Sequence, residues 1–189
     1  MTNDHEIIKL QTLKWVKEII VKYNICPFAK KELERKTIHC AVLDAIDLTE
    51  QLEQINAELI RLDTNEDIAT TLVVFPKLTN NFDAFLDLID YANDLLEMQD
   101  YEGIYQLAHM HPKYCFDDTT MLDAANFTNR SPYPIIHIIR EDEMARVLRV
   151  FPNPEEIPER NIELLRKKGF QEIKAELDAC FDVEDKSTD

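Results

Sequence analysis

Segments with the period of a β-strand alternate along this chain with segments that have the period of an α-helix, and this alternation restricts the fold more than any other feature. Residues 37–43 place apolar side chains at every second position, as a strand with one buried face does. Residues 70–75 (Thr-Thr-Leu-Val-Val-Phe) are β-branched or apolar throughout, which is typical of a strand buried on both faces. Between these runs, leucine and isoleucine recur every three or four positions from Leu48 to Leu62, as along one side of a helix. The order strand, helix, strand predicts a βαβ unit with parallel strands.

The rest of the chain continues the alternation. The further elements predicted are an amphipathic N-terminal helix at residues 7–23, a helix from Phe82 to Leu96, strands at residues 104–108 and 135–139, and closing helices at residues 141–150 and 158–168. The sequence therefore predicts an α/β fold, in which helices pack on a mixed, partly parallel sheet of four strands. We expect a single globular domain over residues 5–181, with flexible termini at residues 1–4 and 182–189.

Glycine is scarce, and its scarcity excludes two classes of nucleotide site. Gly103 and Gly169 are the only two glycines. P-loops and dinucleotide-binding loops need several glycines where the backbone approaches phosphate closely. Any bound anion would therefore have to be held by side chains, helix ends or non-glycine amides.

The charge balance also limits the partners. The net charge of −16, from 37 acidic and 21 basic residues, repels nucleic acids and anionic membrane surfaces, so we expect neither as a partner. The acidic residues are concentrated at residues 44–67 and 83–102, which we interpret as solvated helix faces; an acidic docking surface for a protein partner is the alternative. The four cysteines are widely spaced and the N-terminus lacks a signal-peptide pattern, so the sequence predicts reduced thiols and a cytoplasmic location.

Cys26 is the first candidate for a functional residue. It begins the turn Cys26-Pro27-Phe28-Ala29, which follows the N-terminal helix and is either a loop or the start of another helix. At a helix start, free backbone amides and the helix dipole can stabilise a thiolate, which would make Cys26 a nucleophile. The competing interpretation is a packed, inert thiol, since free cysteine is among the most often buried residue types.

Two histidines stand at the end of the third predicted strand. His109 and His111 are two positions apart, so they share one strand face and could bind a transition metal together. Hydrogen-bonded structural histidines are the alternative. The spacing leaves metal binding by this pair open, and we predict no metal site and no particular cofactor.

A polar segment between two prolines and the strand that follows it form the third candidate. Its amides, hydroxyls and guanidinium resemble a rigid side-chain site for a carboxylate or phosphate. The candidate ligand-binding residues are Asn129, Arg130, Ser131, Tyr133 and Arg140. His137 and Ile135 should face one side of the strand, with Ile136 and Ile138 on the other. The alternative is a proline-stiffened turn whose polar side chains satisfy the local backbone.

At these residues the sequence resembles a family of uncharacterised, mostly bacterial proteins, the domain of unknown function 1415. The resemblance extends from Trp15 to Gly169. It includes the Cys26 turn, His111-Pro112, residues 129–134, His137, Arg140-Glu141 and residues 157–161. It implies that Cys26, His111, Arg130, His137 and Arg140 are signature polar positions, and it implies no activity, substrate or cofactor.

We expect these groups to converge on one pocket between the Cys26 turn and the segment from Asn129 to Arg140. The pocket would bind a small anionic ligand through its guanidinium groups. If the protein is an enzyme, Cys26 is the nucleophile, and His111 or His137 carries the proton. Two alternatives remain open: a ligand-binding protein without catalysis, and a structural or interaction protein that uses its acidic surface.

Overall fold

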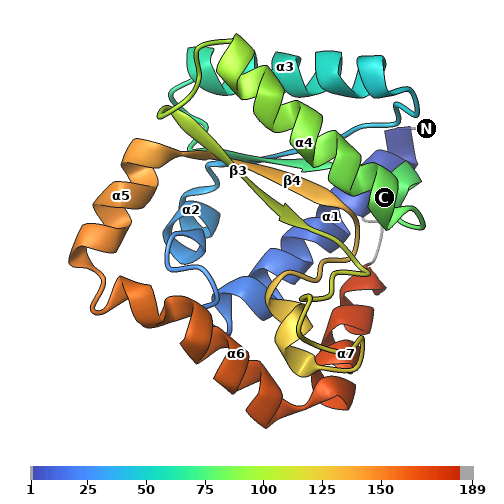
Figure 1. The fold of residues 1–189 in the computed structure, drawn as a ribbon, viewed down its shortest axis with the longest axis vertical. Coiled ribbons are helices and arrows are strands. Elements are labelled where there is room, and N and C mark those ends of the chain that lie inside the picture. The colour runs from blue at the N-terminus through green and yellow to red at the C-terminus, as the bar shows by residue number, and fades with distance from the viewer. Residues whose placement is uncertain (1, 184–189) are drawn as a thin grey trace, which may run out of the picture.

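A mixed four-stranded sheet forms the centre of the computed structural model, which describes residues 2–183 (Figure 1). The strands lie in the order β1 (Ile38–Val42), β2 (Thr70–Val74), β4 (Ile135–Arg140) and β3 (Tyr105–Met110). β1 and β2 are parallel, as the predicted βαβ unit requires, and β4 runs antiparallel to both β2 and β3. The predicted α/β fold with a mixed four-stranded sheet is confirmed.

Helices cover both faces of this sheet. They are α1 (Thr2–Trp15), continued by the π-helical η1 (Val16–Val21), α2 (Ala29–Arg35), α3 (Leu48–Thr64), α4 (Phe82–Met98), α5 (Glu141–Val150), α6 (Ile157–Lys168) and α7 (Phe170–Asp178). Short 3₁₀ turns are η2 (Pro76–Leu78), η3 (Ala124–Thr128), η4 (Pro154–Glu156) and η5 (Ala179–Phe181). None of the helices in residues 2–183 combines the length and apolar character that crossing a bilayer requires.

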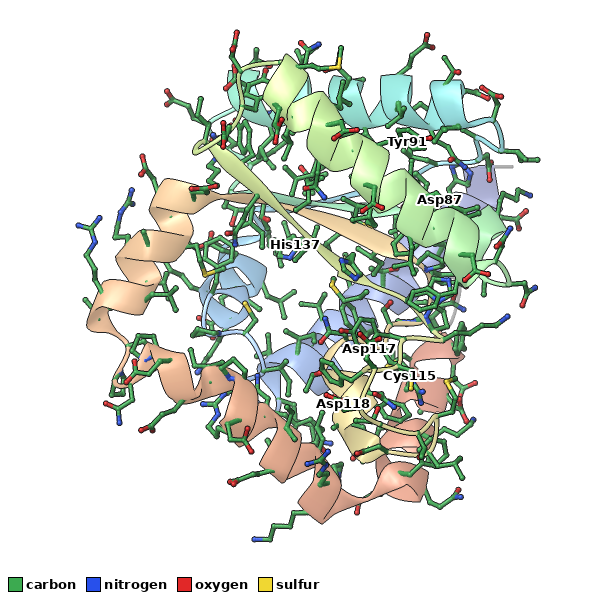
Figure 2. All side chains as sticks on the ribbon, in the orientation of Figure 1. Asp87, Tyr91, Cys115, Asp117, Asp118 and His137 are labelled. Atoms are coloured by element: carbon green, nitrogen blue, oxygen red, sulfur yellow. The ribbon has the colours of Figure 1, made fainter. Side chains whose placement is uncertain are left out.

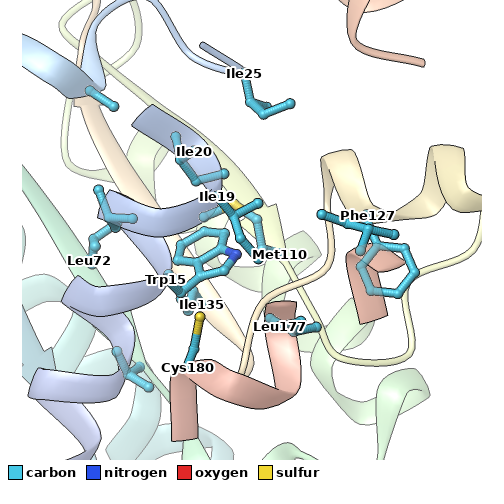
Figure 3. Packing of buried hydrophobic residues seen from close by; sticks show 14 of the residues in the cluster. Trp15, Ile19, Ile20, Ile25, Leu72, Met110, Phe127, Ile135, Leu177 and Cys180 are labelled. Carbon is cyan, nitrogen blue, oxygen red and sulfur yellow. The ribbon is translucent and has the colours of Figure 1, made fainter. Parts of the chain in front are cut away.

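The two faces of the sheet belong to two different apolar cores. Side chains of α3 and α4 pack with Val73, Ile136 and Ile138 on one face. On the other face, side chains of η1, α6 and α7 pack with Leu72 and Ile135, around a buried Trp15 (Figure 3). Ile135 therefore lies on one face of β4 and its neighbour Ile136 on the other, which confirms the predicted alternation.

The N-terminal helix ends where the sequence predicts. Asn24 has a φ of 51°, in the left-handed region that stops a helix, and Pro27 follows it. The next helix, α2, was predicted only as a possible helix start within the Cys26–Ala29 turn, because its residues are mostly charged and show no apolar period. α7 was not predicted, since it buries only Ile173 and Leu177, which are too few to establish a period.

The ends of the chain were expected to be flexible. The structure describes residues 2–4 as the first turn of α1. Met1 and residues 184–189 lie outside the described residues.

The long segment between β3 and β4 is ordered around one buried amide. Asn126 accepts hydrogen bonds from the Phe116 backbone and the Thr119 hydroxyl, and donates one to the Thr120 carbonyl. η3 also packs against α6. These contacts place Thr128 and Asn129, at the end of η3, beside the sheet, where they border the pocket described next.

Candidate functional site

A pocket of about 210 Å³ lies between the sheet and the segment that runs from η1 into α2. Its apolar lining residues are Trp15, Val16, Ile20, Ile25, Phe28, Ala29, Ile38, Leu72, Ala108, Met110 and Ile139. Its other lining residues are Cys26, Glu32, Thr70, Thr128, Asn129 and His137. The structure thus brings together three of the residues singled out from the sequence, which are Cys26, Asn129 and His137.

His137 lies near the middle of β4, at the centre of the molecule (Figure 2). Its Nε2 atom is 2.7 Å from the hydroxyl oxygen of Thr70, on the neighbouring strand β2. Burial disfavours the charged imidazolium and lowers the pKa of His137 to about 4. The ring is therefore neutral at pH 7.

Cys26 lies just before α2, as the helix-start interpretation expects. The backbone amides of Phe28 and Ala29 act on the thiol in the direction that favours the thiolate. Burial has the larger effect and raises the pKa of the thiol above its ordinary value. Cys26 is therefore a protonated, half-buried thiol at neutral pH.

Two α6 side chains hold the turn that carries Cys26. Asn161, which is buried, donates from Nδ2 to the carbonyl of Ile25 at 2.8 Å. Arg160 donates to the carbonyl of Asn24 and to the side-chain oxygen of Asn161. In the sequence, these two residues were noted only because residues 157–161 are part of the resemblance to the DUF1415 family. That resemblance did not indicate which part of the chain they contact.

His111 lies away from the pocket, in the layer formed by α4. It is fully buried, and its ring packs against Phe82 and Phe85. Nε2 is 3.2 Å from the carbonyl oxygen of Leu78, and Nδ1 accepts a hydrogen bond from the Lys113 backbone at 3.0 Å. Both ring nitrogens are thus used in holding the loop, as the structural interpretation of this histidine expects.

Arg130 is also used within the loop. Its Nε donates to the carbonyl of Tyr114 at 2.9 Å, and Nη2 donates to that of Met121 at 3.0 Å. The guanidinium lies over the ring of Phe127 at 4.9 Å. Only 5% of the residue is exposed. Arg130 therefore stabilises the loop from inside and does not line the pocket.

Ser131 and Tyr133 connect the same loop to its surroundings. The Ser131 hydroxyl donates to the carbonyl of Tyr133 at 2.5 Å. The Tyr133 hydroxyl donates to the side-chain oxygen of Gln11, on α1, at 2.5 Å. These contacts fit the alternative of a turn whose polar groups satisfy one another.

Arg140 lies at the end of β4, outside the pocket. It donates to the Tyr105 hydroxyl at 3.2 Å and to the carbonyls of Leu62 and Ile68. It borders a separate polar cleft, together with Arg35, Asp63 and other charged side chains of α2, α3 and α5. Neither arginine of the predicted site therefore contributes charge to the pocket beside Cys26.

The histidine pair does not form a metal cluster with its neighbours. Within residues 2–183 no three His, Cys, Asp or Glu side chains come together as metal ligands. The ring of His109 packs edge-on against Phe85. Cys115, Asp117 and Asp118 lie in the loop beyond β3 (Figure 2), where the Cys115 sulfur accepts a hydrogen bond from the Asn126 amide.

Sequence reasoning did not single out the other lining residues of the pocket, and Thr70, Glu32 and Trp15 matter most among them. Thr70 is the partner of His137, Glu32 contributes the only carboxylate of the lining among the described residues, and Trp15 forms part of the wall. Trp15 and Thr70 look like ordinary core positions, and Glu32 lies in the helix that the apolar period missed. Their common location depends on strand pairing and helix packing that a sequence pattern does not show.

Comparison with known proteins identifies a family but no individual relative. No curated protein and no solved structure matches the chain. The model of the family described as "protein of unknown function (DUF1415)" matches residues 7–175, which include every lining residue of the pocket. The chain therefore belongs to the DUF1415 family.

Proposed function

We propose that the protein binds a small, uncharged and largely apolar molecule in the pocket beside Cys26 and His137. The lining carries this proposal. Apolar side chains form most of the wall, and among the described residues the lining includes no lysine or arginine. Small-molecule sites commonly have this form, because apolar walls supply affinity while a few polar groups fix the orientation of the ligand.

The anionic ligand expected from the arginines has less support. Arg130 and Arg140 donate to backbone carbonyls elsewhere. Glu32, the acidic residue of the lining among the described residues, pairs with Lys31 at 3.5 Å and accepts a hydrogen bond from the Thr37 hydroxyl, so it offers an anion no positive charge. Burying a charge without a partner costs free energy, so a neutral ligand suits this lining better.

Catalysis by Cys26 also has less support than binding. A cysteine nucleophile attacks as the thiolate. Burial raises the pKa of the Cys26 thiol and lowers the pKa of His137, so it disfavours a thiolate paired with an imidazolium. We therefore propose that the pocket binds its ligand without nucleophilic catalysis.

The intrinsic fluorescence of the protein tests this proposal directly, because Trp15 is the only tryptophan and lines the pocket. We expect toluene to change the emission of Trp15 saturably, and benzoate, its anionic counterpart in size, to bind much more weakly. If benzoate binds more tightly than toluene, the pocket prefers an anionic ligand and the proposal of a neutral ligand is wrong. No saturable response to either probe would contradict a small-molecule pocket.

Alkylation of Cys26 supplies a second readout. Cys40 and Cys180 are buried, so a Cys115→Ser background leaves Cys26 as the one half-buried thiol among the described cysteines. At pH 7 we expect slow alkylation by iodoacetamide, slowed further by toluene. Fast alkylation at neutral pH, with a rate that titrates below pH 7, would instead favour an activated nucleophile.

A further inference from the structure

A π-helical turn borders the pocket. This turn is η1, which continues α1 over Val16–Val21. Two hydrogen bonds show its wide winding, because each joins residues five positions apart. The amide of Lys22 donates to the carbonyl of Lys17 at 3.2 Å, and the amide of Ile25 donates to the carbonyl of Ile20 at 2.9 Å. Turns of this kind are rare, lie mostly inside α-helices and are frequent at functional sites.

The winding of η1 determines which of its side chains line the pocket. Trp15, Val16 and Ile20 line it, whereas Ile19 is buried in the surrounding core without lining it (Figure 3). In an α-helix each residue advances by about 100°, so Ile19 would lie between Trp15 and Val16. Ile20 would lie about 140° from Trp15. A π turn takes more residues, so each residue advances by a smaller angle, which brings Ile20 between Trp15 and Val16. The observed lining therefore matches the π winding.

The same turn holds the chain next to Cys26. Ile25 precedes Cys26, and its amide is bonded to the carbonyl of Ile20 within η1. All three of these residues line the pocket. One segment of π winding thus fixes both the helical wall of the pocket and the beginning of the Cys26 turn.

From this geometry we infer that η1 shapes the pocket for its ligand, and that the chain keeps the π turn for binding at a cost in stability. The inference rests on the proposed function and names the segment that determines the shape of the site. An α-helical segment would restore the ordinary hydrogen bonds between residues four apart, and side chains that moved into the pocket would gain packing contacts. A turn with a structural role alone would instead stabilise the fold.

Deletion of Lys17 tests this inference, because a segment that is one residue shorter can wind as an α-helix with both ends in place. Lys17 is exposed and its ammonium group contacts the neighbouring Glu18, so the deletion removes no buried side chain. We expect calorimetry to show about tenfold weaker binding of toluene, because the wall loses its packing against the ligand. Tm should stay at the wild-type value or rise.

Lys17→Ala is the matched control, since it removes the same charge and keeps the length of η1. It should bind toluene as the wild type does. If the deletion variant also binds toluene with wild-type affinity, η1 does not shape the site, while the proposed pocket stands. If the deletion prevents folding or lowers Tm more than the control does, the turn serves packing and the inference is wrong. If the wild type does not bind toluene, the proposed function fails and the inference fails with it.

Hydrogen exchange in the wild type tests the same segment without any variant. The amides of Lys22 and Ile25 donate the two hydrogen bonds of the π winding. Saturating toluene should slow their exchange more than it slows that of α3 amides, because α3 packs in the other core and the ligand contacts Ile20. Equal slowing in η1 and α3, or no slowing in η1, would overturn the inference.

Discussion

At the scale of single residues, the neutral state of His137 links the pocket to the stability of the protein. Burial lowers the pKa of this histidine from 6.5 to about 4. The unfolded chain therefore binds a proton near pH 6.5 that the folded protein does not bind until about pH 4, and stability is lost as the pH falls through this window. At 1.36 kcal/mol per pKa unit, the loss is about 3 kcal/mol.

Urea unfolding between pH 7 and pH 4 measures this effect. We expect the free energy of unfolding of His137→Phe to fall less steeply across the window than that of the wild type. His109 and His111 also have pKa values lowered mainly by burial, so they supply a background slope of the same sign in both proteins. Parallel curves for the two proteins would mean that His137 titrates alike in the folded and unfolded chain.

The candidate site was predictable from sequence only in part, for a reason that individual residues make clear. His137 could be assigned to the pocket face because strand alternation fixes the direction of its side chain relative to Ile136. The location of the Arg130 side chain could not be predicted in the same way, because its partners are the carbonyls of Tyr114 and Met121 in an irregular loop. The spacing of apolar residues predicts helices and strands, but it does not predict the conformation of a loop. Polar residues that hold a loop and polar residues that bind a ligand look alike in a sequence.

At the scale of elements, α6 acts on the pocket through the Cys26 turn. Replacing Asn161 by Ala leaves the buried carbonyl of Ile25 without its donor, which costs about 1–3 kcal/mol. We also expect faster alkylation of Cys26 in Asn161→Ala, measured in the Cys115→Ser background, because the turn loses one of its two attachments to α6.

Glu163→Ala is the control for this variant, since Glu163 is exposed on the same helix. It should leave both the midpoint of unfolding and the alkylation rate unchanged. If Asn161→Ala lowers stability and leaves Cys26 as slow to react as before, the turn is held by its own packing and not by α6.

The elements themselves were predictable where one face of each is buried and the other is exposed. α3 shows this best, because Ile55, Leu59 and Leu62 are fully buried and repeat at helical spacing. The order of the strands was not predictable, since nothing in the periods of β3 and β4 places β4 between β2 and β3. That arrangement depends on which strands bury the most apolar surface, and Ile135, Ile136 and Ile138 of β4 are all fully buried.

At the scale of the whole molecule, the excess negative charge lies on exposed helix faces. Asp87 and Tyr91 are exposed on α4 (Figure 2), and residues 83–102 contain no lysine or arginine. Asp90, Asp94 and Glu97 are also exposed and are spaced three or four residues apart, so they repel one another along the helix. These positions fit the interpretation of a solvated acidic face.

A pair of charge reversals separates the effect of net charge from that of local position. Asp83→Lys and Asp94→Lys each raise the net charge by two units, but Asp83 is in the first turn of α4 and Asp94 is near its end. The helix dipole favours negative charge at the start of a helix and positive charge at its end. We expect Asp94→Lys to stabilise the protein by about 1 kcal/mol, because the new lysine also lies between Asp90 and Glu97.

Thermal unfolding at low ionic strength measures both variants. A gain of about 1 kcal/mol corresponds to a rise in Tm of about 2–4 °C for a chain of this size. Asp83→Lys should lower Tm or leave it unchanged, because losing a favourable acid at the helix start opposes the relief of overall repulsion. Equal gains in the two variants would show that long-range repulsion across the molecule, and not position on the helix, sets the cost of this acidic surface.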